Sequence, residues 1–98
     1  MSVLLEFAMF PTDKGVSVSE FVARIIKNLE TSGYNYQLTP MGTIVETDTI
    51  EQALDIVKDS YYLLEKDCSR VYSSLKFDIR SGQQDRMLKK MESIKAKL

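Results

Sequence analysis

Residues 34–46 read Tyr-Asn-Tyr-Gln-Leu-Thr-Pro-Met-Gly-Thr-Ile-Val-Glu, which is two short strand-like runs joined by a Pro-Met-Gly corner. Pro40 fixes its own φ and has no backbone N–H, so it belongs at a turn or on a sheet edge. Gly42 is expected to supply the backbone freedom that the reversal needs. The segment therefore predicts a β-hairpin with hydroxyls and a carboxylate close to its turn.

The residues ahead of this hairpin predict a strand and a helix. Residues 2–10 alternate, and because both faces of the strand are mostly apolar, it is expected to be central in the sheet. One face holds Val3, Leu5, Phe7 and Met9, and the other holds Leu4, Glu6, Ala8 and Phe10. Ser17 and Glu20 have the spacing of a capping box, which predicts the start of a helix that Gly33 closes.

The residues after the hairpin predict a helix, a strand and a last helix. Thr49 and Gln52 form a second capping box. The apolar stripe expected on that helix is Ala53, Leu54, Val57, Tyr61 and Leu64. Residues 70–80 alternate as a strand, and a terminal helix is expected from about Gln84, with Met87, Met91, Ile94 and Leu98 along one face.

This order of elements predicts the fold. Right-handed crossovers turn β-α-β-β-α-β into an α+β ferredoxin-like sandwich, with an antiparallel sheet in the order 4-1-3-2 and two helices on one face. Residues 1–98 are expected to form one such domain with an extra C-terminal helix. Two helices cover only one sheet face, and the other face carries Leu4, Ala8, Phe10 and Tyr72. That face is too apolar to remain exposed to solvent in a monomer, which predicts a homodimer or homotetramer.

Composition limits the class of protein. The apolar and charged fractions, 44% and 28%, are ordinary for a soluble globular protein, and no apolar run is long enough to span a membrane. The N-terminus lacks the basic region of a signal peptide, and a single cysteine, Cys68, cannot form an intramolecular disulfide. These features predict a cytoplasmic protein.

The missing residue types disfavour catalysis. The chain has no histidine, no Cys/His cluster for zinc and no glycine-rich phosphate loop, so no metal or cofactor is expected. Residues 80–98 hold six basic side chains against two acidic ones, but no aromatic residue lies among them. Nucleic-acid binding is therefore disfavoured, and a solvated helix is the simpler interpretation.

Three parts of the chain together carry a family resemblance. The hairpin segment, the Glu6-Phe7 pair ahead of Pro11 and the run Lys76–Arg80 resemble the small thiamine-binding (YkoF-like) family of ferredoxin-like proteins. The resemblance implies sheets that pack into dimers and tetramers, and a pyrimidine moiety bound beside the sheet. Thiamine is a cation with an aminopyrimidine ring, so it needs a carboxylate, an aromatic or thioether surface and a few hydrogen-bonding groups. The residues expected to supply these are Glu6, Tyr36, Thr39, Met41, Thr43 and Glu46.

Simpler interpretations of these residues stay open. Glu6 can form a structural ion pair with Lys76, and threonines are common in strands. The first hypothesis is a non-enzymatic, homo-oligomeric binding protein for thiamine or its hydroxymethylpyrimidine moiety. A structural or regulatory oligomer without a small ligand is the second, and a small interface-site enzyme using Glu and Lys is the third.

Overall fold

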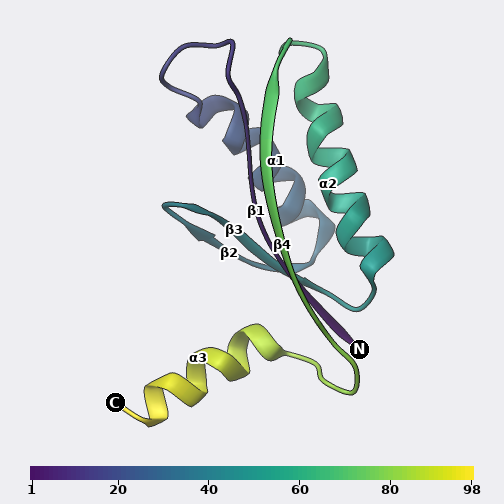
Figure 1. Cartoon of the computed structure of the whole chain (residues 1–98), viewed down its shortest axis with the longest axis vertical. Coiled ribbons are helices and arrows are strands. Elements are labelled where there is room, and N and C mark those ends of the chain that lie inside the picture. The colour runs from purple at the N-terminus through teal and green to yellow at the C-terminus, as the bar shows by residue number, and fades with distance from the viewer.

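The chain runs through four strands and three helices in the order β-α-β-β-α-β-α (Figure 1). The computed structural model describes residues 1–98. The strands are β1 (Ser2–Pro11), β2 (Asn35–Thr39), β3 (Gly42–Thr47) and β4 (Val71–Arg80). The helices are α1 (Ser19–Ser32), α2 (Ile50–Glu65) and α3 (Arg86–Ala96). Every predicted element is present, and the α+β ferredoxin-like class is confirmed.

The four strands form one antiparallel sheet in the order β2-β3-β1-β4. Read from the other edge, this is the predicted order 4-1-3-2. β1 is central, as its two apolar faces indicated. The β1–β4 register places Glu6 opposite Lys76 and Phe7 opposite Leu75.

The core lies on the face that α1 and α2 cover, which we call the helix side. On β1 it is built from Val3, Leu5, Phe7 and Met9, all buried, and from Val45 on β3. The opposite face, which carries Leu4, Glu6, Ala8 and Phe10 on β1, is called the open face. α3 is the only helix on the open face, where it borders a pocket together with β1 and β3. It lies apart from α1 and α2 (Figure 1). None of the helices has both the length and the apolar character needed to cross a membrane.

α1 begins later than predicted. Val18 is its N-cap, and no side chain caps the helix, so the Ser17–Glu20 capping box is wrong. The reason is that the Val18 carbonyl already accepts the first helical hydrogen bonds, from the N–H groups of Phe21 at 3.0 Å and Val22 at 3.1 Å. Ser17 is thereby left outside the first turn. The C-terminal prediction is confirmed, because Gly33 closes the helix at φ 82°.

α2 has the predicted start but a shifted apolar face. Thr49 and Gln52 form the reciprocal capping box. The predicted stripe is wrong at Leu54 and Tyr61, which are 50% and 41% exposed. The residues that face the sheet are Ala53, Ile56, Ser60 and Leu64. Ser60 enters the core because its hydroxyl donates to the Ile56 carbonyl at 2.7 Å, which satisfies the polar group.

The β2–β3 hairpin turns through Pro40 and Met41, with Thr39 paired to Gly42. Gly42 does not have a positive φ, so backbone freedom is not what this turn requires of it. Instead, a Cβ at this position would lie 3.1 Å from the Phe7 carbonyl oxygen of β1. Glycine therefore lets the hairpin approach the central strand closely.

Candidate functional site

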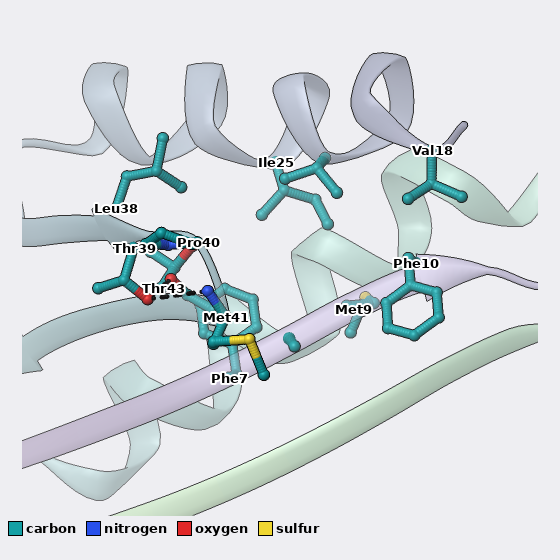
Figure 2. A pocket seen from close by; sticks show the side chains of 13 residues that line it. Phe7, Met9, Phe10, Val18, Ile25, Leu38, Thr39, Pro40, Met41 and Thr43 are labelled. Carbon is teal, nitrogen blue, oxygen red and sulfur yellow. Dashed lines mark hydrogen bonds between the residues drawn. The ribbon is translucent and has the colours of Figure 1, made fainter. Parts of the chain in front are cut away.

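The tip of the β2–β3 hairpin, the central strand and the start of α1 enclose a pocket of about 220 Å³, which we call the hairpin pocket. Figure 2 shows Leu38 and Met41 on the hairpin side and Val18 and Ile25 on the α1 side. Phe7, Met9 and Phe10 line it from β1. No charged side chain borders the hairpin pocket. An apolar slot of this kind suits a flat, uncharged ring.

Two threonine hydroxyls supply the polar side-chain groups of the hairpin pocket. Thr39 Oγ1 donates to the Gly42 carbonyl at 2.8 Å and accepts from the Met41 N–H at 3.3 Å (Figure 2), so its proton is already used by the turn. Thr43 is only 5% exposed, yet its hydroxyl makes no hydrogen bond within the chain. The hydroxyl oxygen is not shielded from solvent, because the only side-chain polar atom that is fully buried without a partner is Arg86 Nε, so a bound molecule with a hydrogen-bonding edge can pair with Thr43.

The six residues predicted from the sequence do not line one cavity. Thr39, Met41 and Thr43 come together in the hairpin pocket. Glu6 and Glu46 lie on the open face, since Glu6 is opposite Ile44 and Glu46 is opposite Leu4. Tyr36 is opposite Val45 and so points to the helix side.

Glu6 borders a second pocket, of about 370 Å³, between the open face and α3. Its carboxylate lies 3.6 Å from Lys76 Nζ, as the ion-pair interpretation expected. The floor is apolar, with Leu4 and Ile44, and Met87 and Met91 form the wall on α3. Because both members of the ion pair reach solvent, their attraction is weak.

Glu46 is held by its own chain. Its carboxylate accepts hydrogen bonds from the Ser2 hydroxyl at 2.5 Å and from the backbone N–H groups of Arg86 at 2.9 Å and Met87 at 3.2 Å. Partial burial acts to raise the pKa of Glu46, but these hydrogen bonds and the Arg86 charge outweigh it and lower the pKa overall. Glu46 therefore caps the first turn of α3.

Tyr36 donates its hydroxyl proton to the Glu30 carboxylate at the end of α1, at 3.0 Å. This hydrogen bond is the main reason that the pKa of Tyr36 is raised. Tyr36 and Glu46 are both among the residues that line a third hollow, of about 470 Å³, between the β2 edge and α3, although their side chains point to opposite faces of the sheet. No group of three or more His, Cys, Asp or Glu side chains is placed to hold a metal ion.

Comparison with known proteins places the chain in a family. Residues 5–95 match the family model described as thiamine-binding protein. The chain belongs to this family. The match covers β2, β3, β4, α1 and α2 completely and all but the ends of β1 and α3, and it includes every residue that lines the hairpin pocket.

Relatives in this family come from archaea and bacteria. The UPF0045 protein MJ1052 of Methanocaldococcus jannaschii is 30% identical over 92 residues, which are 94% of this chain and 91% of that protein. Its crystal structure matches with a TM-score of 0.84, covering 95% of both chains. The UPF0045 protein Mb1933 of Mycobacterium bovis is 31% identical over 94 residues, or 96% of this chain and 92% of that protein.

A further solved structure shows the same fold at lower identity. It is TM0486 of Thermotoga maritima, described as a proposed thiamine biosynthesis/salvage protein. The two proteins are 24% identical, and the match has a TM-score of 0.79 over 95% of this chain and 99% of the other. The family is thus shown by sequence, and its fold by structure.

Two features of the structure were not predicted from the sequence. The first is the α1 wall of the hairpin pocket, which Val18 and Val22 line together with Phe10 of β1; helical spacing marked Val22 only as a core residue and did not mark Val18. The second is Arg86, which appeared to be one cation of a solvated helix but is only 3% exposed. Its guanidinium donates to the carbonyls of Ser2, at 2.9 Å, and of Asp78, and it lies 3.1 Å from the Asp78 carboxylate.

Proposed function

We propose that this protein is a non-enzymatic binding protein for thiamine or its hydroxymethylpyrimidine moiety, and that it acts in the cytoplasm as a homo-oligomer of one-domain chains. Membership of the thiamine-binding family supports the ligand class. The observation that carries the proposal is the unpaired Thr43 hydroxyl at the base of an uncharged apolar pocket.

In this proposal the pyrimidine ring enters the hairpin pocket. The rings of Phe7 and Phe10 and the Met41 thioether offer the apolar and polarisable surface that an aromatic heterocycle prefers. Thr43 supplies both a donor and an acceptor for a ring nitrogen or an exocyclic amine. Met41 is 89% exposed, so it can close over a ring that enters from solvent.

The positive thiazolium ring of thiamine is left outside the hairpin pocket. Burying a cation without a carboxylate partner is unfavourable, and the hairpin pocket has none. We therefore expect hydroxymethylpyrimidine alone to bind nearly as well as thiamine. Glu6 and Glu46 do not contact the pyrimidine in this arrangement.

Calorimetric titration tests the proposal. Thiamine and hydroxymethylpyrimidine should bind, and unrelated heterocycles of similar size should not. Thr43→Val keeps the shape of the side chain and removes the hydroxyl, so affinity should fall by about tenfold. The matched control is Thr31→Val at the exposed end of α1, where the same change should leave affinity unaltered. Binding of neither compound to the unaltered protein would overturn the proposal.

A further inference from the structure

A further hollow, of about 590 Å³, opens beside the hairpin pocket, and we call it the α1 groove. All of its lining residues except Leu38 lie on α1. Val22 and Leu38 border both the hairpin pocket and the α1 groove. Leu38 and Val18 stand at opposite ends of the hairpin pocket (Figure 2). The α1 groove therefore continues the hairpin pocket past its Leu38 end.

One row of side chains on α1 leads along the α1 groove. Val22, Ile26 and Glu30 are spaced by four residues, so they lie on one face of the helix. Ile26 is partly buried and packs against the core, which makes the middle of the row apolar. Val22 and Glu30 are about 12 Å apart along the helix axis. The row thus begins at the hairpin pocket and ends at a carboxylate.

Charged side chains appear only in this outer part of the combined cavity. Glu30 is the one acidic residue, and Lys27 the one basic residue, that borders either the hairpin pocket or the α1 groove. Neither forms an ion pair within the chain. The Glu30 carboxylate accepts one hydrogen bond, from the Tyr36 hydroxyl at 3.0 Å. A carboxylate has further acceptor positions, so Glu30 is held in place and can still face a cation.

β2 places an aromatic ring beside this carboxylate. Tyr36 and Leu38 alternate on β2, opposite Val45 and Thr43, and so both point to the helix side. The Tyr36 ring is partly buried against the core, and its hydroxyl reaches Glu30. A carboxylate next to an aromatic ring and an apolar side chain suits a flat organic cation, which is attracted by both the charge and the ring.

We infer that the thiazolium ring of thiamine lies in the α1 groove beside Leu38, with Glu30 as its carboxylate partner and Tyr36 next to it. The inference rests on the proposed function, because the pyrimidine ring has to occupy the hairpin pocket. A single methylene group joins the two rings of thiamine, so the thiazolium must leave the hairpin pocket directly beside the pyrimidine. Glu30 then takes the part for which the sequence offered Glu6 and Glu46.

The gain in affinity from this contact is small. Glu30 is exposed, so water screens its attraction for the cation, and Lys27 in the same groove opposes it. An exposed ion pair of this kind should make thiamine bind about threefold more tightly than hydroxymethylpyrimidine. The α1 groove therefore selects between the two compounds, whereas the hairpin pocket supplies most of the affinity for both.

Calorimetric titration of both compounds tests the inference through the ratio of their affinities. Glu30→Gln removes the charge and should abolish the preference for thiamine. Glu30→Lys should reverse it, to about threefold in favour of hydroxymethylpyrimidine. Lys27→Gln should change the ratio in the opposite direction, toward thiamine. The matched control is Glu65→Gln in the last turn of α2, which should keep the ratio of the unaltered protein. Affinity for the neutral hydroxymethylpyrimidine should stay within about twofold in every variant.

The possible failures are distinguishable. If neither compound binds the unaltered protein, the proposed function falls, and this inference with it. If both bind but Glu30→Gln leaves their ratio unchanged, the hairpin pocket stands and the thiazolium lies elsewhere. If Glu30→Lys weakens both compounds equally, the residue acts through the position of α1, and its role as the partner of the cation is overturned.

An NMR comparison of the two ligands locates the thiazolium directly. On the ¹⁵N-labelled protein, thiamine should move the amide signals of Ile26–Glu30 and Tyr36 in addition to those that hydroxymethylpyrimidine moves. These additional shifts should shrink in Glu30→Lys. Additional shifts confined to Phe10 and Tyr72, whose rings are in contact at the other end of the hairpin pocket, would overturn the placement in the α1 groove.

Discussion

The carboxylate of Glu46 on β3 accepts a hydrogen bond from the backbone N–H of Arg86, forty residues later, at 2.9 Å. The same carboxylate also accepts from the Met87 N–H and the Ser2 hydroxyl. It thus caps α3 from a neighbouring strand, where the N-terminal end of a helix favours negative charge. Asp85, the N-cap residue by position, has φ 54° and makes no side-chain cap. This contact attaches α3 to the sheet together with the hydrogen bonds that the Arg86 side chain makes to β1 and β4.

We expect Glu46→Gln to loosen α3 without disturbing the sheet. The amide is nearly the same shape, but its NH₂ group must face one of the backbone N–H donors, and the charge is lost. The expected cost is about 1 kcal/mol. Amide hydrogen exchange should become faster over Arg86–Lys90 and stay unchanged in β1. Glu92→Gln, on the exposed part of α3, is the matched control, and equal protection in both variants would contradict the capping role.

Stability should fall in acid through the same residue. Because the pKa of Glu46 is lower in the folded protein than its ordinary 4.5, the folded state binds this proton less readily than the unfolded chain does. The contribution of Glu46 is therefore complete above about pH 4.5 and is lost as the pH drops through its folded-state pKa. Urea unfolding measured from pH 6 to pH 3 should show this loss. In Glu46→Gln, that part of the pH dependence should be absent.

Arg86 should matter more to stability than any exposed cation of α3. Its side chain is buried and donates to backbone carbonyls at the ends of both β1 and β4. Arg86→Met keeps the apolar length of the side chain but leaves those carbonyls without a donor, and it should cost about 2 kcal/mol. Arg86→Lys should not restore the loss fully, because one ammonium cannot reproduce the fork of a guanidinium. Thermal unfolding of Arg86→Met and of Lys89→Met measures this difference in stability. Equal melting temperatures of the two variants would contradict the structural role of Arg86.

Binding of hydroxymethylpyrimidine should be insensitive to Glu6. This carboxylate lies on the open face, paired with Lys76, while the hairpin pocket opens between the hairpin tip and α1. Calorimetry of Glu6→Gln should give an affinity within about twofold of the unaltered protein. The sequence hypothesis of a carboxylate-lined site predicts a much larger loss, so this one variant separates the two models.

The fold could be read from local sequence, because each element carries its own signal. The alternation in residues 2–10 and the Thr49–Gln52 capping box depend on neighbours in the chain, and both predictions are confirmed. Glu46 could not be interpreted in the same way. Its partners Ser2 and Arg86 lie 44 and 40 positions away from it in the chain, and no periodic pattern marks such a contact.

The candidate site was predictable only in part for a similar reason. Thr39, Met41 and Thr43 are close in sequence, so the turn was enough to bring them together. Tyr36 and Glu46 belong to the same hairpin, but alternation sends them to opposite faces of the sheet. The opposite wall comes from α1, and the position of that helix is set by packing rather than by its own sequence.

The central claim is that a pyrimidine ring binds in the hairpin pocket, and the most direct measurement is an NMR titration of the ¹⁵N-labelled protein with hydroxymethylpyrimidine. We predict that the amide shifts concentrate at Met41–Thr43, at Ala8–Phe10 and in the first turns of α1, and that they are lost in Thr43→Val. Shifts confined instead to Leu4, Ile44 and α3 would place the ligand on the open face and contradict the account.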